Sequence, residues 1–258
     1  MGEPPFGLGW DVAGVVVEMG YGVTLFEPGD RVFGMPWFPR EAGAYAEYVT
    51  APSRQFARIP NELSFEEAAA VPLASITAWQ SLVDTAELRA GQTVLMHGAS
   101  GGVGHLAVQI AKARGAHVVG TASAAKHDWL RSLGVDECVD REAVPVSEAA
   151  GGVDVVLDFA GRHETLAELE TLRDGGILIA IASGASEEAK SEAPKRDIKV
   201  AELLVEPDGH ALGEIAALVK SDRLSVTVDR VLPLEDAVKA HQLLESGDVR
   251  GKLVLGVT

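Results

Sequence analysis

Cysteine is almost absent from this sequence, because Cys138 is the only one in 258 residues. No internal disulfide can therefore form, and no zinc site built on several cysteines is possible. Long apolar runs are also missing, since none approaches the roughly 20 residues that a membrane-spanning helix needs. The opening residues, MGEPPFGLGW, carry no pattern of a secretory signal. These absences predict a cytoplasmic protein that does not cross a membrane.

Basic residues are also scarce relative to acidic residues. The chain has 22 Lys and Arg residues against 38 Asp and Glu residues, a net charge of −16. This excess of negative charge repels nucleic-acid backbones and anionic membranes, so neither is expected as the main partner. An anionic small molecule can still bind where basic side chains or backbone amides gather locally. Hydrophobic residues make up 47% and charged residues 23%, which is typical of an ordinary soluble protein.

The pattern of residues changes along the chain and predicts three parts. Residues 1–74 contain short β-branched runs punctuated by Gly and Pro, and then a helix that begins at a Ser64–Glu67 capping box. In residues 75–222, strands alternate with helices, and continuous apolar runs such as ILIAIA predict strands buried on both faces. Residues 223–258 have the pattern strand, helix, strand. The predicted fold is α/β: a doubly wound parallel Rossmann sheet plus a partial β domain.

The stretch HGASGGVG, residues 97–104, supports two interpretations. Gly98 to Gly102 match G-x-S-x-G, the nucleophile elbow that would make Ser100 the attacking group of a serine hydrolase. The same letters continued to Gly104 resemble a glycine turn that holds a nucleotide phosphate. The two interpretations require different sequence features elsewhere in the chain, and these features can be compared.

A serine hydrolase needs an acid and then a histidine later in the chain. Asp158 followed by His210 or His241 has that order, but order alone is a weak filter. His241 falls on the predicted apolar stripe of a helix, where a packed histidine is the usual explanation. No HGGG-type oxyanion loop precedes the stretch. The members of this stripe are Leu234, Val238, His241 and Leu244.

A phosphate site needs a strand, a tight glycine turn and a helix whose free N–H groups face the anion. Residues 93–114 supply all three in order. Gly101 would let the backbone approach a pyrophosphate, and Gly104 would let the helix pack closely on the sheet. Ala99 stands where the first glycine of G-x-G-x-x-G belongs. This pattern favours a dinucleotide site formed by Ser100, Gly101, Gly102 and Val103.

The residues after the second predicted strand, TASAAKHDW, indicate which dinucleotide binds. NAD-binding versions of this fold place an acid about 20 residues after the first glycine, where it holds the ribose hydroxyls. Here no acid occurs before Asp128, and Thr121, Ser123 and Lys126 stand in its place. A ribose 2′-phosphate favours hydroxyl donors and a cation, and a carboxylate would repel it. The sequence therefore favours NADP(H) over NAD.

Four longer stretches resemble one known family. They are GWDVAGVVVEMGYGVTLFEPGDRVFGM, AAAVPLASITAWQSL, LMHGASGGVGHLAVQIAKARGAHVVGTAS and VRGKLVL, in this order. They are similar to the quinone oxidoreductases, the zeta-crystallin-like branch of the medium-chain dehydrogenase/reductase superfamily. The resemblance implies a GroES-like catalytic domain, a Rossmann domain and NADPH in the cleft between them. It also implies reduction of quinones or of alkenes conjugated to a carbonyl, often by a homodimer.

The resemblance also suggests site residues. Trp10 stands where zinc-dependent relatives have a metal-ligand histidine, and their four-cysteine cluster has no counterpart, so a zinc alcohol dehydrogenase mechanism is not expected. Trp10 is expected either to wall the substrate pocket or to pack in the core. Thr77 matches a threonine that faces the nicotinamide carboxamide, with helix packing as the alternative. Further positions expected beside the cofactor are Gly161, Ile181, Ser183, Arg250 and Lys252.

The resemblance begins where the family already has several strands, so the chain is expected to lack the opening part of the catalytic domain. Cofactor binding through residues 98–126 should not depend on this opening part. Whether the chain is catalytically active stays open. The sequence does not select Tyr45 or Tyr48 as a proton donor. The polar segment 183–197 is predicted to be a mobile loop. The leading hypothesis is a zinc-independent, NADPH-dependent quinone or enone reductase. A non-catalytic NADPH-binding protein, an enoyl-thioester reductase and the serine hydrolase remain alternatives.

Overall fold

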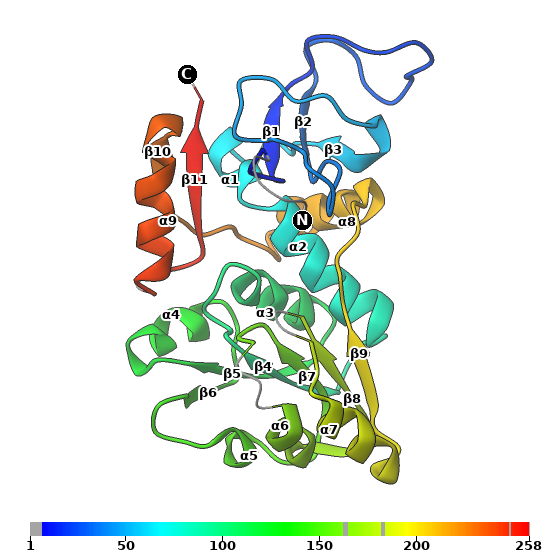
Figure 1. Cartoon of the computed structure of the whole chain (residues 1–258), viewed down its shortest axis with the longest axis vertical. Coiled ribbons are helices and arrows are strands. Elements are labelled where there is room, and N and C mark those ends of the chain that lie inside the picture. Colours follow the sequence, from blue (N-terminus) through cyan, green and yellow to red (C-terminus); the bar gives the residue numbers. More distant parts are fainter. Residues whose placement is uncertain (1–6, 162–164, 182–183, 248, 258) are drawn as a thin grey trace. The chain divides into compact units, whose positions relative to one another are not determined.

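The structure is a computed structural model of the chain, and it describes all residues except 1–6, 162–164, 182–183, 248 and 258. The chain divides into two compact units. The first unit combines residues 1–76 with residues 205–258, and the second comprises residues 77–204. In Figure 1 the first unit carries the blue, cyan and orange-to-red segments, and the second is mostly green and yellow.

A six-stranded parallel sheet forms the centre of the second unit. Its strand order is β6-β5-β4-β7-β8-β9, so the chain runs outward from β4 to one edge and then returns to build the other half from β7. This reversal is the defining feature of a doubly wound sheet and confirms the predicted Rossmann fold. The strands are β4 (Thr93–His97), β5 (His117–Ala122), β6 (Glu137–Asp140), β7 (Val153–Asp158), β8 (Leu172–Ala180) and β9 (Lys199–Glu202).

Helices cover this sheet because its central strands are apolar on both faces. Leu95, Val156 and Leu178 from three neighbouring strands are fully buried. α3 (Gly104–Ala113) packs against β4 and β5, and α6 (Thr165–Thr171) packs against β7 and β8. The other helical segments of this unit are η2 (Gln80–Thr85), η3 (Ala124–Lys126), α4 (His127–Ser132), α5 (Val146–Ala149), α7 (Glu187–Glu192) and η4 (Ala193–Arg196).

Asp154 ties together the starts of β4 and β7. Its carboxylate accepts hydrogen bonds from the Thr93 amide at 2.8 Å, from Arg173 Nε at 2.7 Å and from the Gln92 side chain at 3.4 Å. Burial raises the pKa of Asp154, but these donors together outweigh it, so the pKa lies below its ordinary value. The charged form is therefore the one that stabilises the folded state.

We expect Asp154→Asn to destabilise the protein by about 1–3 kcal/mol at neutral pH, since a partly buried acceptor of several hydrogen bonds is weakened. Because the pKa of Asp154 is lower in the folded state, its charged carboxylate stabilises the folded protein fully above the unfolded-state pKa of roughly 4. This stabilisation is lost as the pH falls through the folded-state pKa. The difference between wild type and variant should therefore shrink in acid when urea unfolding is measured as a function of pH. Asp174→Asn, at an ion pair whose carboxylate is 77% exposed, is the control and should change little. A difference in unfolding free energy between wild type and Asp154→Asn that did not change with pH would contradict this account.

The first unit contains a small antiparallel sheet of order β1-β2-β3 and a separate parallel pair, β10 and β11. The predicted capping box is confirmed, because Ser64 Oγ accepts the Glu67 amide and the Glu67 carboxylate accepts the Ser64 amide. The elements are β1 (Val12–Val15), β2 (Arg31–Gly34), η1 (Ser53–Gln55), β3 (Phe56–Arg58), α1 (Phe65–Ala69), α2 (Pro72–Trp79), α8 (Gly209–Lys220), β10 (Val228–Pro233), η5 (Leu234–Asp236), α9 (Ala237–Glu245) and β11 (Lys252–Gly256). α2 crosses the boundary between the units.

Three sequence-based expectations need correction. Residues 205–222 were predicted to belong to the Rossmann domain, but α8 packs against β3 and groups with the first unit. The predicted loop at 183–197 contains helix α7, which begins where the Ser186 hydroxyl accepts the Ala189 amide. The predicted apolar stripe of α9 is not buried, because the helix packs through Ala240 instead. In α9, Val238 is 71% exposed, Leu244 is 50% exposed and His241 is exposed.

Among the described residues, no helix is long and apolar enough to cross a bilayer.

Candidate cofactor site

The glycine-rich stretch forms a tight turn between β4 and α3, at the point where the order of the sheet reverses. Gly98 has a φ of +77°, a left-handed conformation that glycine adopts without strain. The Gly101 amide donates to the Gly98 carbonyl at 3.0 Å, which closes the turn. The Ala99 amide donates to the Thr121 carbonyl at 3.2 Å and fixes the turn to the end of β5.

Gly104 allows the start of α3 to approach this turn. A Cβ atom at position 104 would lie 2.3 Å from the Gly98 carbonyl oxygen and 2.7 Å from the Ala99 backbone, closer than real Cβ atoms come. The role predicted for Gly104, close packing of the helix, therefore has a geometric basis. The turn and the helix cannot keep these positions with any larger residue.

The start of α3 offers hydrogen-bond donors to an anion. Within the described part of the chain, the amides of Gly102 and Val103 donate to no protein acceptor. No acidic side chain lies in the first turn of α3, and no side chain caps it. Free amides and the positive end of the helix dipole together favour a negative group here. The strand, turn and helix therefore have the geometry of a phosphate site.

The hydrolase interpretation gains no support from this geometry. Within the described residues, no histidine side chain bonds to the Ser100 hydroxyl, and Ser100 is 8% exposed. Asp158, the proposed acid, instead accepts the Ala160 and Gly161 amides through Oδ1, at 2.8 and 2.9 Å. His241 bonds to Tyr45 in the first unit. Asp158 and His241 thus have other partners.

The predicted 2′-phosphate residues follow β5. The Lys126 amide donates to the Ser123 carbonyl at 2.9 Å in the short helix η3, so both residues lie at the same strand end. Thr121 is 5% exposed, and its hydroxyl bonds to His97 Nδ1 at 3.2 Å. Arg141, to which no sequence motif pointed, lies at the same strand end, because its amide donates to the Ala122 carbonyl at 3.2 Å. This backbone contact places Arg141 beside Ser123, a proximity that needs the pairing of β5 with β6 to be known.

Two other predicted residues lie at the ends of β7 and β8, on the same edge of the sheet as the glycine turn. The Gly161 amide is held by Asp158, and the Ile181 amide donates to the Asp158 carbonyl at 3.2 Å. Asp158 is 2% exposed and orders both strand ends, a role that the sequence did not reveal. Ser183 lies outside the described residues. Thr77, also predicted, is buried in α2, where its carbonyl accepts the Ser81 hydroxyl at 2.7 Å.

The remaining predicted residues lie in the first unit. Trp10 donates through Nε1 to the Arg40 carbonyl at 2.7 Å and meets the Phe38 ring edge-on, with ring centres 5.5 Å apart. The Arg250 amide is 3.3 Å from Asp229 Oδ1. Lys252 Nζ is 3.4 Å from Asp11 Oδ2.

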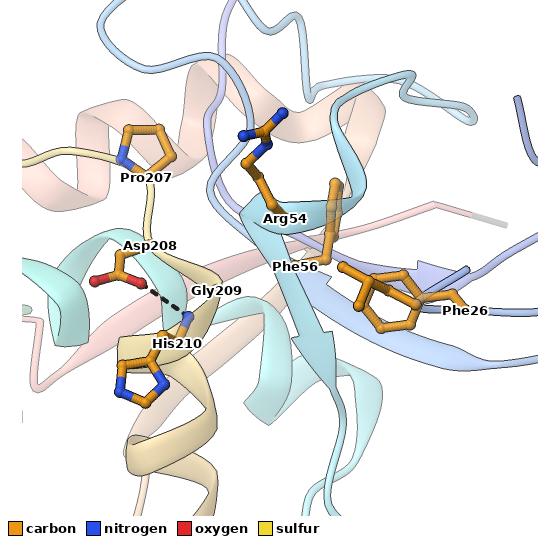
Figure 2. A pocket seen from close by; sticks show the side chains of 8 residues that line it. Phe26, Arg54, Phe56, Pro207, Asp208, Gly209 and His210 are labelled. Atoms are coloured by element: carbon orange, nitrogen blue, oxygen red, sulfur yellow. Dashed lines mark hydrogen bonds between the residues drawn. The ribbon is translucent and has the colours of Figure 1, made fainter. Parts of the chain in front are cut away.

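The first unit also has a surface hollow of about 530 Å³, shown in Figure 2. The rings of Phe26 and Phe56 lie on one side of it, and the start of α8 lies on the other. There the Asp208 carboxylate accepts the His210 amide at 2.8 Å and caps the helix. None of the residues predicted to bind the cofactor lines this hollow, so it is not the predicted cofactor site.

The described residues contain no group of three or more His, Cys, Asp or Glu side chains placed to hold a metal ion.

Two protein-family models match parts of this chain. Residues 133–255 match a model described as zinc-binding dehydrogenase, and residues 1–61 match the alcohol dehydrogenase GroES-like domain. The chain is 32% identical to the NAD(P)H oxidoreductase RTN4IP1 of Danio rerio, over 99% of this chain and 73% of that protein. The chain belongs to the medium-chain dehydrogenase/reductase superfamily. It is therefore a member of a superfamily of NAD(P)-dependent oxidoreductases.

Another relative of this dehydrogenase/reductase is much larger. The chain is 39% identical to the spectinabilin polyketide synthase system protein NorB of Streptomyces orinoci, over 96% of this chain. It spans only 12% of the length of NorB. A sequence similar to this chain thus also occurs as one part of a much longer protein.

Solved structures agree with the family assignment of this dehydrogenase/reductase. The quinone oxidoreductase from Coxiella burnetii matches with a TM-score of 0.91 and 36% identity, over 99% of this chain and 80% of that one. Mycobacterial Rv1454c, solved in complex with NADPH, matches with a TM-score of 0.87 and 30% identity, over 98% and 83%. The CurK enoyl reductase matches with a TM-score of 0.86 and 27% identity, over 98% and 80%.

Proposed function

We propose that this protein is an NADPH-dependent reductase of quinones and α,β-unsaturated carbonyl compounds, acting without zinc. The observation that supports this most is the turn at residues 98–104, whose free amides lie at the point where the sheet reverses. The matches to a quinone oxidoreductase and to a protein solved with NADPH support the same class of chemistry.

The residues present fit a dinucleotide phosphate. The amides of Gly102 and Val103 would bind the diphosphate, and Ser123, Lys126 and Arg141 would surround the 2′-phosphate. A bound nicotinamide would supply a hydride. The protein's own contribution would be to fix the reacting carbons in contact, exclude water and stabilise the negative charge that develops on the substrate oxygen.

The test is a turnover assay on the purified chain. NADPH oxidation is followed with a naphthoquinone and with a 2-alkenal, before and after treatment with a strong zinc chelator. We expect turnover with both substrates, unchanged by the chelator and faster with NADPH than with NADH at low cofactor concentration. Tight NADPH binding without turnover would favour the non-catalytic alternative. Loss of activity on chelation would contradict a zinc-independent mechanism.

An enoyl-thioester reductase is a second candidate. It is supported by the similarity to NorB and to the CurK enoyl reductase. A short crotonyl thioester in the same assay separates the two candidates, because a dedicated thioester reductase should prefer it strongly over a free 2-alkenal.

A further inference from the structure

A buried histidine supports the glycine turn from within α3. His105 is 0% exposed, and its ring nitrogen Nδ1 lies 3.0 Å from the Gly101 carbonyl oxygen. A carbonyl oxygen can only accept a hydrogen bond, so Nδ1 carries the hydrogen and donates it. The same carbonyl also accepts the His105 amide at 3.1 Å. Two donors from one residue therefore hold the Gly101 carbonyl.

These two bonds set the direction of the Gly102 amide. The Gly101 carbonyl and the Gly102 N–H belong to one planar trans peptide unit, so they point in opposite directions. Because the carbonyl points along α3 toward His105, the N–H points out of the helix start, where an anion would bind. Within the described residues this amide has no protein acceptor. Two consecutive glycines have unusual backbone freedom, so the orientation needs such an anchor.

The His105 ring is itself held in place. It stacks on Trp129 of α4, with ring centres 6.1 Å apart and 29° between the ring planes. Close packing around a fully buried imidazole leaves it no other position to turn to. The ring is therefore a rigid support for the glycine turn.

We propose that His105 is a positioning residue for the cofactor, which aims the Gly102 amide at the diphosphate. This inference rests on the proposed function and deepens it, because it names the side chain that fixes one of the two free amides of the turn. The diphosphate is common to NADPH and NADH, so His105 should support the binding of both equally. Ser123 and Lys126 differ in this respect, because they are proposed to contact only the 2′-phosphate.

Helix α3 offers a matched control one turn further along. The Gln109 side chain is 6% exposed, and its Nε2 donates to the His105 carbonyl at 2.9 Å. Like the His105 bond, it joins a buried side chain to the carbonyl four residues earlier. The peptide unit that it holds carries the Leu106 amide, which donates to the Val103 carbonyl at 3.1 Å. Removing the Gln109 bond therefore disturbs α3 without releasing an amide of the turn.

The binding test uses NADPH, NADH and ADP-ribose, which keeps the diphosphate but lacks nicotinamide. His105→Leu should weaken the binding of all three by about tenfold, the effect of losing roughly one hydrogen bond to a charged group. His105→Asn should recover most of this affinity, because its amide nitrogen can replace Nδ1 as the donor. Gln109→Leu should keep the three wild-type dissociation constants, although urea unfolding should show a loss of stability in both Leu variants.

NMR of the free protein tests the orientation without a binding measurement. In wild type labelled with ¹⁵N at histidine, His105 Nδ1 should carry a hydrogen at neutral pH. With ¹⁵N at glycine, the Gly102 amide signal should broaden or split in His105→Leu, because the glycine pair then adopts several orientations. The same signal should remain as in wild type in Gln109→Leu.

The outcomes separate this role from the proposed function. If wild type binds NADPH but His105 Nδ1 carries no hydrogen, or if His105→Leu binds all three ligands as tightly as wild type, the role of His105 is wrong and the proposed function stands. Equal weakening in both Leu variants, or a loss confined to NADPH, would overturn the role of His105 in the same way. If wild type binds neither NADPH nor NADH saturably, both proposals fall.

Discussion

Gly104→Ala is expected to abolish measurable NADPH binding and to destabilise the protein by about 3 kcal/mol, the upper part of the usual range for overpacking. A methyl group at this position would lie 2.3 Å from the Gly98 carbonyl oxygen, and the nearby atoms are backbone that cannot rotate away. Either α3 or the turn must therefore move, and the amides of Gly102 and Val103 lose their common direction. NADPH titration by fluorescence and urea unfolding measure the two effects.

Gly213→Ala is the matched control for this substitution. Gly213 also lies in a helix, α8, but a Cβ atom there would have no neighbour within 4 Å. The same chemical change should stabilise the protein by roughly 0.5–1 kcal/mol, because alanine is the better helix former, and should leave cofactor binding unchanged. Normal NADPH affinity in Gly104→Ala would show that the turn does not hold the phosphates.

Ser123→Asp is expected to weaken NADPH binding by about 100-fold and to leave NADH binding equal or stronger. The new carboxylate would stand at the end of β5, where like charge repels a 2′-phosphate at a cost of several kcal/mol. A carboxylate in this part of the fold can instead accept hydrogen bonds from the ribose hydroxyls of NADH. Titration with both cofactors at fixed ionic strength gives the ratio of the two dissociation constants.

Ser191→Asp makes the same change in net charge on α7, after β8, and is the control for Ser123→Asp. It should leave both affinities within about twofold of wild type, because exposed charges more than roughly 10 Å apart are largely screened at ordinary salt. An equal loss of NADPH affinity in both variants would mean that overall charge, not a phosphate site beside Ser123, determines the preference.

The parallel sheet was predictable because its signal is local. Each apolar run such as ILIAIA becomes a buried strand, and the capping box at Ser64 marks a true helix start. The glycine turn was predictable for the same reason, since strand, turn and helix are contiguous in residues 93–114. Contacts between distant segments were not predictable. Arg141 reaches the end of β5 only because β6 pairs with β5, and nothing near residue 141 indicates that pairing.

The errors have physical causes too. The segment 183–197 is rich in polar and small residues, which resembles a loop, yet Ser186 caps a short helix within it. The stripe of α9 was inferred from spacing alone, and a helix that rests on small residues such as Ala240 can leave its larger apolar residues exposed. His241 was taken for a packed residue for the same reason, and the structure gives it a tyrosine partner instead.

The central claim is that backbone amides at the start of α3 bind the cofactor diphosphate. The most direct measurement is NMR of protein labelled at glycine amide nitrogens during titration with NADPH. The account predicts that the amide signal of Gly102 shifts strongly and saturates with the binding curve, while that of Gly213 stays in place. Saturable NADPH binding that leaves the amide signal of Gly102 unmoved would contradict it.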